Sequence, residues 1–586
     1  MPLWQKLGDL QEGINRISIL VYGCVFALFA LAGTIEGLLQ WKNTYFVSAF
    51  YAVCALSVLI TFLYHYLKCI EAIRVVSYLK HEWSDAFLLV LMALALWLKT
   101  EIFAIFAILR HSVLGVRIFL RSTRGQRVIE SLVQNPAKVV VFSFLLLIAL
   151  GTIFLMFPRA TVDMKGLRFM DALFTSTSAT CVTGLTVIVT SKDALAPHGV
   201  PALSFFGQIV LLLLIQAGGL GIMTLSTSAA LLLGGRLSAR GARVMQDVLD
   251  EETPVGVQTL VRQTVLMTFA IESAGALALS LRFLEEFSDE PAQAVFYGIF
   301  HAISAFCNAG FSLYSQNLTS FMDDKAMVLI VSSLIILGGL GFLVNAAILS
   351  PSRYKKGFRA FVRGLPLHAK LVLVTTAILI FSGTILLLLL DRNGAQQGLS
   401  FEDRLWASFF QSVSARTCGF NTVDLSKTSR SAVFVYLALM FIGASPGGTG
   451  GGIKTTTAAL LILNIRAILL GREQVEVFGR TVPGKTVRKA IAISTVSFVA
   501  CFLVALLLLA TQKGISMESL LFETVSAFGT VGLSMGATMK LDTFGRLCII
   551  FLMFVGRVGP LTLTLALGQR PVQSGIRFPQ ERVTVG

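Results

Sequence analysis

Long uncharged apolar runs constrain this chain more than any other feature. Two examples are VVVFSFLLLIALGTIFLMF (139–157) and LVLVTTAILIFSGTILLLLL (371–390), each about long enough to cross a bilayer core. Of the 586 residues, 55% are hydrophobic and 14% are charged, too apolar a composition for a soluble protein of this size. The sequence predicts an all-α polytopic protein of the cell inner (plasma) membrane, and its N-terminus has no cleavable signal pattern.

The basic residues of the chain mark one side of the membrane. The 48 Lys and Arg outnumber the 32 Asp and Glu, and short loops between apolar runs carry most of the excess. This distribution predicts cytoplasmic loops facing membrane lipid headgroups and argues against nucleic-acid binding. The eight cysteines form no CxxC or zinc-like spacing, so we expect free thiols. The basic segments are 234–243, 351–370, 466–489 and 569–586.

Four short segments repeat along the chain, each with a Ser-Ala start and a glycine followed by an apolar residue. The third copy is one residue shorter than the others, which leaves its register open. The copies are SATCVTGL (178–185), SAFCNAGF (304–311), SARTCGF (414–420) and SAFGTVGL (526–533), closing on Gly184, Gly310, Gly419 and Gly532.

Each copy lies in the same surroundings. A long apolar run and a short amphipathic stretch, about long enough for a half-spanning helix, precede it, and a second apolar run follows it. Since the basic loops follow the second run, we expect all four units to enter and leave on the cytoplasmic side. The first runs are 139–157, 262–283, 371–390 and 489–511, and the second are 203–233, 327–349, 432–470 and 544–567.

This arrangement predicts four linked helix–pore-helix–filter–helix units around a pseudo-fourfold pore. Irregular backbone at membrane depth is tolerated only where protein buries it or where it lines water. Four irregular segments around one axis could replace the hydration shell of a monovalent cation with backbone carbonyls, and glycine permits the required backbone orientation. The predicted units are 131–240, 241–350, 351–470 (with a broken second helix) and 471–570, followed by a cytoplasmic tail at 571–586.

Several motifs together resemble the Trk/Ktr/HKT superfamily of potassium and sodium transporters. They are the four segments with QAGGLGIMT (216–224), ASPGGTGGGIKTTT (444–457) and GRVGPLTL (556–563), and bacterial Trk/Ktr pore subunits match best. The resemblance covers roughly residues 130–570. It implies a channel-like pore, a homodimer and a cytosolic regulatory ring that binds nucleotide. It also implies potassium as the transported ion and no cofactor on this chain.

The resemblance places the ion-binding residues in the four segments. Glycine in all four copies is similar to potassium-conducting members, whereas sodium-selective plant members carry serine in the first copy. Potassium is therefore the favoured ion. The expected filter residues are Cys181, Val182, Thr183, Gly184, Cys307, Asn308, Ala309, Gly310, Thr417, Cys418, Gly419, Gly529, Thr530, Val531 and Gly532.

The glycine-rich stretch SPGGTGGGIKTTT (445–457) has two interpretations. A Walker phosphate loop needs glycine directly before lysine, but Ile453 separates Gly452 from Lys454, and apolar runs flank the stretch. We therefore predict that the chain is not an enzyme. The resemblance implies that the stretch is an intramembrane gating loop. The expected gating residues are Gly447, Gly448, Thr449, Gly450, Gly451, Gly452, Lys454 and Arg557.

Charged residues near the predicted pore leave alternatives open. Arg557 is either a positive charge facing the pore or a structural arginine on backbone carbonyls. Arg416 is expected to be a structural charge behind the filter. A sodium- or proton-coupled secondary transporter is the alternative function, and Glu272 is its candidate relay. The acidic residues of the half-helices either cap helix dipoles or form a negative outer ring: Asp171, Glu290, Glu402, Asp403, Glu518 and Glu523.

The N-terminal 130 residues lie outside the repeats. The runs 17–38, 45–66 and 85–109 predict about three extra membrane helices. The arginine-rich segment 110–127 that follows is either a basic interfacial helix or a voltage-sensor-like segment. The sequence predicts an N-terminal extension (1–130) joined to the four-unit core.

Overall fold

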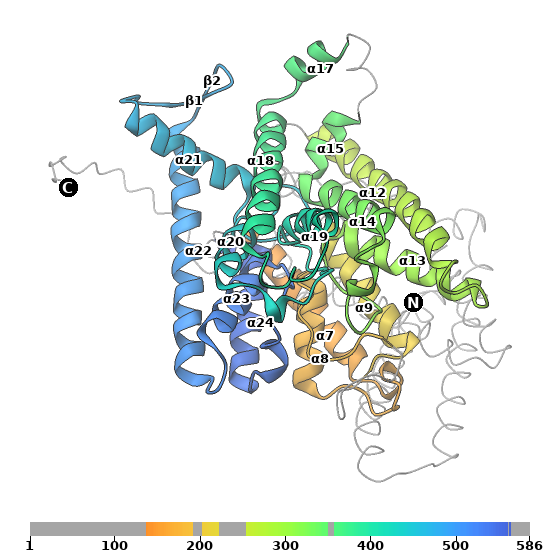
Figure 1. Cartoon of the computed structure of the whole chain (residues 1–586). Coiled ribbons are helices and arrows are strands. Elements are labelled where there is room, and N and C mark those ends of the chain that lie inside the picture. Colours follow the sequence, from red (N-terminus) through yellow and green to blue (C-terminus); the bar gives the residue numbers. More distant parts are fainter. Residues whose placement is uncertain (1–135, 192–201, 222–253, 350–356, 561, 564–586) are drawn as a thin grey trace, which may run out of the picture. The chain divides into compact units, whose positions relative to one another are not determined.

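The fold is described for residues 136–191, 202–221, 254–349, 357–560 and 562–563 of a computed structural model. These residues all belong to one compact unit of the chain, Asn135–Gly586. The expected N-terminal helices and the arginine-rich segment 110–127 lie outside the described residues. Figure 1 presents the helices of the described unit, with α18 and α22 running along much of its height.

A long apolar helix opens each repeated unit. Four described helices are long and apolar enough to cross a membrane, and each corresponds to a predicted first run. Their outward-facing side chains are apolar, as Phe381 (71% exposed) and Phe498 (63% exposed) illustrate, which suits contact with lipid. These helices are α7 (Pro136–Leu155), α12 (Pro254–Phe283), α18 (Leu367–Leu390) and α22 (Gly484–Thr511).

A short helix follows each long one. Its 12 to 16 residues extend about 18–24 Å at 1.5 Å per residue, too short to cross the roughly 30 Å apolar core. Serine caps begin two of these helices: Ser400 accepts a hydrogen bond from Asp403 N, and Ser516 from Ser519 N. The short helices are α8 (Phe169–Thr180), α13 (Pro291–Phe306), α19 (Phe401–Ser414) and α23 (Met517–Gly529).

The second helix of each unit begins at a capping side chain. Ser204, Asp324, Ser429 and Asp542 each accept a hydrogen bond from a backbone N–H of the first turn. In the third unit the helix is interrupted, as predicted, by the glycine-rich loop (442–454). The helices are α9 (Phe205–Leu220), α14 (Lys325–Leu340), α20 (Arg430–Phe441) with α21 (Thr455–Leu469), and α24 (Thr543–Val558).

The second unit also has a broken helix, which the sequence analysis did not predict. Helix α14 is followed by α15 (Phe342–Ile348) at an angle of 109°. The break falls at Gly341, whose φ of +92° is costly for a residue with a side chain. Gly221 and Gly559, which follow α9 and α24, also have positive φ values. The second apolar run 327–349 is therefore two helices, whereas a broken second helix was expected in the third unit alone.

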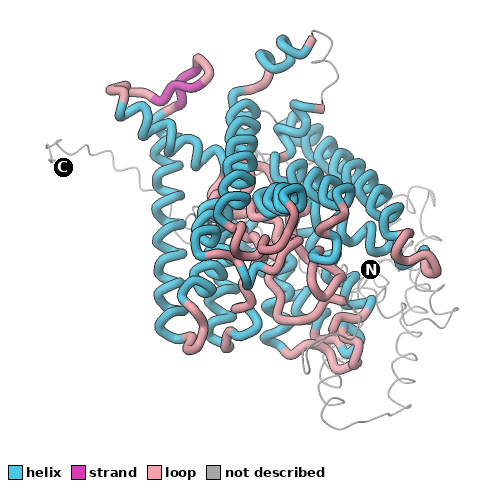
Figure 2. The backbone as a smooth tube through the Cα atoms, viewed as in Figure 1, coloured by secondary structure: helices cyan, strands magenta, loops and turns pink. Residues whose placement is uncertain are grey.

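The helices of the four units pack in a closed cycle. Each second helix lies against the short helix of the next unit: α9 on α13, α14 on α19 and α20 on α23. The cycle closes where α24 packs against α8 of the first unit. The largest hydrophobic cluster contains buried side chains of all four short helices, including Phe174, Phe300, Phe410 and Phe528. Loop segments lie inside this helical bundle as well as at its ends (Figure 2).

Smaller elements complete the unit. A hairpin of β1 (Val475–Val477) and β2 (Arg480–Val482) follows α21, and its strands are antiparallel with Val475 opposite Val482. Phe478 and Gly479, both at positive φ, form its turn. The helix α17 (Phe358–Gly364) precedes α18. Four short 3₁₀ turns lie at Pro158–Ala160, Thr319–Phe321, Leu425–Lys427 and Thr538–Lys540.

Candidate functional site

The structure brings the four glycine segments (178–185, 304–311, 414–420 and 526–533) into contact with one another. At each closing glycine, an added Cβ would meet the carbonyl oxygen of the residue before the glycine of another segment. The distances are 2.4 Å from Gly184 to Ala309 O, 2.1 Å from Gly310 to Cys418 O, 2.3 Å from Gly419 to Val531 O and 2.1 Å from Gly532 to Thr183 O. The four contacts form a closed ring, in the order of the units along the chain.

Besides the closing glycine, one residue in each glycine segment has a left-handed backbone. These residues carry side chains, so the conformation is uncommon, and they lie two positions before the closing glycines. Because Thr417 keeps this spacing to Gly419, the register of the short third copy is resolved, and its deletion lies between Ser414 and Thr417. The φ values are 49° at Val182, 58° at Asn308, 79° at Thr417 and 49° at Thr530.

The first serine of each copy fixes its segment to the short helix. Ser304 Oγ donates a hydrogen bond to Phe311 O (2.8 Å), and Ser526 Oγ donates to Leu533 O (2.7 Å). Ser414 Oγ bonds Phe420 O in the same way, and Ser178 Oγ accepts from Gly184 N (3.1 Å). In the sequence these serines served only to identify the repeat, and their hydrogen bonds to the glycine segments were not predicted.

The thiols of the glycine segments are buried and free. Cys181, Cys307 and Cys418 form no disulfide, as the sequence predicts. Cys307 Sγ lies 3.8 Å from Glu272 Oε1, and both oxygens of Glu272 accept hydrogen bonds from Gln216 Nε2 at 3.1 Å. Glu272 therefore lies behind the second glycine segment, held by neighbours of the first and second units.

The glycine-rich loop folds back on itself between α20 and α21. Gly443 N donates to Ile453 O (2.9 Å), and Ala444 N donates to Gly451 O (3.3 Å), which holds the two ends of the loop together. Lys454 Nζ donates to Gly450 O at 2.7 Å within the loop. Two of its glycines, Gly447 (φ 71°) and Gly452 (φ 68°), need their left-handed backbone for these turns.

The loop lies against the second helices of other units. Ser445 N and Thr449 N donate to the carbonyls of Gly339 (3.0 Å) and Gly338 (3.1 Å) at the end of α14. Gly447 O accepts from Phe342 N, at the start of α15. Gly452 N donates to Gly556 O of α24 at 3.3 Å, and a Cβ on Gly448 would lie 2.8 Å from Gly339 O. The bend in α14–α15 therefore provides part of the surface on which the loop sits.

The loop also touches the ring of glycine segments directly. Gly451 N donates a hydrogen bond to Thr530 Oγ1 (2.9 Å), and Thr449 Oγ1 donates to Phe306 O (3.1 Å) at the end of α13. A Cβ added to Gly450 would lie 1.9 Å from Thr417 Oγ1. Larger residues would not fit between the loop and the ring without movement of one of them.

Two arginines, the buried Arg416 and the half-buried Arg557, bond to backbone carbonyls around the loop. The guanidinium of Arg557 donates to Thr449 O in the loop and to Gly218 O of α9, with a further bond of 3.3 Å to Gly219 O. Arg416 donates to Gly443 O (3.4 Å), where the loop begins. These contacts correspond to the carbonyl-capping alternative for Arg557 and connect the loop to the first unit.

Glycines of the second helices allow close approach to the short helices. A Cβ on Gly218 would lie 1.9 Å from Thr180 O, and one on Gly556 would lie 1.9 Å from Phe528 O. Gly338 has the same relation to Phe306 O. A different close approach joins the third and fourth units, because Gly529 of α23 lies against Met440 O of α20. Gly529 was expected in the filter, whereas no role was predicted for Gly218, Gly338 or Gly556, although QAGGLG and ILGGLG contain two of them.

Three of the six acidic residues of the short helices are ion-paired across units. Asp171 of α8 pairs with Arg546 of α24 at 2.6 Å, with side chains only 16% and 21% exposed. Glu402 of α19 pairs with Lys325 of α14, and Glu518 of α23 lies 3.5 Å from Arg430 of α20. At the remaining junction, Phe205 and Phe296 are in ring contact at 4.9 Å. These ion pairs and the ring contact therefore connect helices of neighbouring units.

The remaining acidic residues have other surroundings. Glu523 lies in the middle of α23, fully buried, where it accepts hydrogen bonds from Ser534 and Thr538. It does not lie at the start of the helix, where the sequence analysis placed it. Asp403 accepts from Ser400, and Glu290 caps α13 without a side-chain hydrogen bond. Among the described residues, the six carboxylates therefore do not form a ring of unpaired negative charges.

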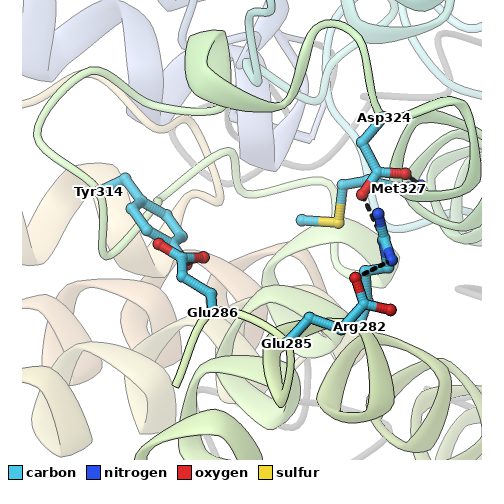
Figure 3. A network of polar contacts seen from close by, with 6 residues as sticks. All are labelled: Arg282, Glu285, Glu286, Tyr314, Asp324 and Met327. Carbon is cyan, nitrogen blue, oxygen red and sulfur yellow. Dashed lines mark hydrogen bonds and ion pairs between the residues drawn. The ribbon is translucent and has the colours of Figure 1, made fainter. Parts of the chain in front are cut away.

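A polar network joins three parts of the second unit (Figure 3). Arg282, at the end of α12, donates from Nε to Asp324 at 2.6 Å and also pairs with Glu285. Asp324 in turn accepts from Met327 N (3.0 Å), and Tyr314 donates to Glu286 at 2.7 Å. Tyr314 lies three residues after the second glycine segment, so its bond to Glu286 connects that segment to the residues just after α12.

Among the described residues, no group of three or more His, Cys, Asp or Glu is placed to hold a metal ion. The oxygens that surround the ring belong instead to backbone carbonyls and hydroxyls. Similarity to known proteins adds to this geometry: the TrkH family, described as a cation transport protein, matches residues 99–572. The chain belongs to the TrkH family of cation transport proteins.

Individual TrkH-type relatives agree with this assignment. Ktr system potassium uptake protein B of Bacillus subtilis is 38% identical over 454 residues, covering 77% of this chain and 97% of that protein. Potassium/sodium uptake protein NtpJ of Enterococcus hirae is 36% identical over 459 residues, with the same coverage of 77% and 97%. The crystal structure of the potassium transporter TrkH from Vibrio parahaemolyticus has a TM-score of 0.59 at 21% identity, covering 84% of this chain and 97% of that one.

Membership of the TrkH family makes this chain a transport protein rather than an enzyme. The apolar helices and the family place it in the plasma membrane as a multi-pass protein. The predicted resemblance and the predicted all-α membrane fold are confirmed.

Proposed function

We propose that this TrkH-family protein takes up potassium across the cytoplasmic membrane through a channel-like pore. The ring of four glycine segments would be its selectivity filter, with carbonyl oxygens replacing the hydration shell of the ion. One observation carries the proposal: each closing glycine approaches a carbonyl of another segment, and the four contacts close on themselves. A set of unrelated helix-linking turns would have no reason to form such a cycle.

Potassium is the proposed ion for two reasons. Several relatives are named as potassium uptake proteins, including the Ktr system protein B of Bacillus subtilis. Each of the four segments also closes with glycine, so a serine side chain does not enter the ring. NtpJ of Enterococcus hirae is named for both potassium and sodium, and the ratio between the two ions is therefore a quantity to measure.

The glycine-rich loop would be the gate. It lies against the ring through Gly450 and Gly451, and Arg557 bonds it to the first unit. A positive guanidinium at this depth would also raise the barrier to cation passage. Opening would then require the loop to leave the ring and the bond from Arg557 to Thr449 O to break.

Assembly with other subunits is part of the proposal. The relatives' names describe them as members of a Ktr or Trk system. We infer a homodimer whose basic cytoplasmic loops dock a cytosolic regulatory ring, with nucleotide bound by the ring and not by this chain. The domain organisation would be the N-terminal extension (1–130), the four pore units of residues 131–570 and a cytoplasmic tail (571–586).

Flux through purified protein in liposomes tests the proposal. A potassium gradient should drive a flux whose reversal potential follows potassium alone, and deletion of residues 447–452 or Arg557→Ala should increase the flux without an activator. A reversal potential that shifts with the proton or sodium gradient would instead indicate a coupled transporter. Unchanged flux in both variants would place the gate elsewhere.

A further inference from the structure

The four left-handed residues of the ring differ in what their side chains bond. Asn308 and Thr417 are hydrogen-bonded to each other at 3.2 Å, across the second and third segments. Val182 has no polar atom in its side chain. Thr530 Oγ1 accepts a hydrogen bond from the backbone N–H of Gly451 at 2.9 Å, and Thr530 is fully buried. The fourth segment is thus bonded to the loop through a side chain of the ring itself.

Gly451 occupies a central position in the loop. Its carbonyl accepts a hydrogen bond from Ala444 N, and the next residue, Gly452, donates to Gly556 O of α24. A Cβ on Gly451 would lie 2.4 Å from Thr530 Oγ1, so the hydroxyl and the loop backbone are in close contact. Withdrawal of the loop would break this bond and leave the Thr530 hydroxyl free within the ring.

We propose that Thr530 is a positioning residue that couples the glycine-rich loop to the fourth filter segment. With the loop seated, the Gly451 N–H holds the Thr530 hydroxyl toward the loop. With the loop withdrawn, the hydroxyl changes partner and the segment can relax. This inference rests on the proposed function, because it requires that the loop moves and that the ring passes ions.

The bond should stabilise the seated loop measurably. Replacing the hydroxyl by a methyl group leaves the buried Gly451 N–H without its acceptor, a change that costs on the order of 1 kcal/mol or more. Such a cost corresponds to a shift of about fivefold toward the open state. Thr530→Val is a suitable change, because Val182 occupies the equivalent position with the same φ of 49°.

Potassium flux into liposomes containing the full-length protein tests the inference as a double-mutant cycle. Thr530→Val should raise passive flux about fivefold, and the increase should be clearly smaller in Thr530→Ser, which keeps the acceptor for the Gly451 N–H. In a protein lacking residues 447–452, Thr530→Val should add nothing. Thr524→Val is the matched control, because Thr524 Oγ1 bonds Leu520 O within the same helix and does not contact the loop.

The outcomes separate this inference from the proposed gate. If the loop deletion raises flux but Thr530→Val does not, the coupling is wrong and the gate stands. If Thr530→Val multiplies flux equally with and without the loop, Thr530 acts on the filter alone and the coupling is again wrong. If the loop deletion leaves flux unchanged, the proposed gate itself fails. Thr530→Ala carries the same expectations should the valine variant not fold.

Discussion

At the scale of single residues, the closing glycines are constrained twice. Gly532 has a φ of 90°, and a Cβ there would also lie 2.1 Å from Thr183 O. A side chain at this position would both strain the backbone and push apart two segments of the ring. The positive φ alone therefore does not explain why glycine occupies these positions.

Gly532→Ala should abolish selective potassium flux, whereas Gly536→Ala should largely retain it. Gly536 has a similar φ of 85° but no neighbour within 4 Å of an added Cβ, so it carries only the backbone strain of about 1–2 kcal/mol. At Gly532 the overpacking adds about 1–3 kcal/mol inside the ring. The measurement is potassium flux through variants that remain monodisperse after purification. Equal losses of flux in both variants would contradict the steric explanation.

Asp391, which follows the last residue of α18, offers a prediction about pH. Its side chain is fully buried and accepts a hydrogen bond from Ser429 N at 2.8 Å. Burial raises the pKa of the Asp391 carboxyl above its ordinary value, although hydrogen bonds from Ser429 partly oppose the shift. A raised pKa in the folded state adds stability below the unfolded-state pKa, and this contribution is lost as pH rises through the folded-state pKa.

Asp391→Asn should therefore be at least as stable as wild type at pH 7, because the amide keeps the acceptor for Ser429 N without a buried charge. As the pH is lowered toward 4, the free energy of unfolding of wild type should rise relative to that of the variant. Melting curves of the detergent-solubilised proteins between pH 4 and 7 measure the difference. A difference that does not change with pH would show that ionisation of Asp391 has no effect on stability.

At the scale of helices and loops, the sequence predicted the regular parts well and the breaks less well. The long and short helices follow from apolar length and from Ser-Ala repeats. The long helices end within two residues of the expected runs, although α12 begins eight residues before its run. The break at Gly341 was missed because the run 327–349 is continuously apolar, and hydropathy does not distinguish a straight helix from a bent one. The bend becomes understandable with the fold, where Gly341 has a positive φ and Phe342 N donates to the loop carbonyl of Gly447.

The site itself was predictable as a repeat but not as a ring. Four glycines in equivalent positions can be found by eye, whereas the contact between Gly532 and Thr183 joins segments almost 350 residues apart. The register of the third copy also needed the backbone, since one deleted residue can be placed at several positions in SARTCGF. The bonds of Arg557 to carbonyls of two units have no signature in the sequence.

The ion pairs between units provide a prediction about helix packing. Asp171→Asn should lower the stability of the solubilised protein by about 1.5–3 kcal/mol, since it breaks a charged hydrogen bond between two largely buried side chains. Glu518→Gln should change it by less than about 1 kcal/mol, because its partner Arg430 is 89% exposed. Thermal melting in detergent compares the stability losses of the two variants. Equal losses would mean that the ion pair between α8 and α24 contributes no more than the exposed pair.

At the scale of the whole molecule, one chain surrounds the proposed pore with four linked units. The last unit must return to the first, and it does so through three features: the packing of α24 on α8, the contact of Gly532 with Thr183 O, and the pair of Arg546 with Asp171. Closure of the cycle of four units therefore depends on residues near both ends of the four-unit core. The family match begins at residue 99, so most of the N-terminal extension precedes it.

The central claim is that cations bind within the ring of the four glycine segments. Crystals of the protein grown with thallium, a potassium analogue with strong anomalous scattering, test this claim directly. We expect anomalous peaks on the axis of the ring, within coordination distance of the carbonyls of Thr183, Ala309, Cys418 and Val531. Peaks elsewhere in the membrane region, with none in the ring of a protein that still conducts potassium, would contradict the account.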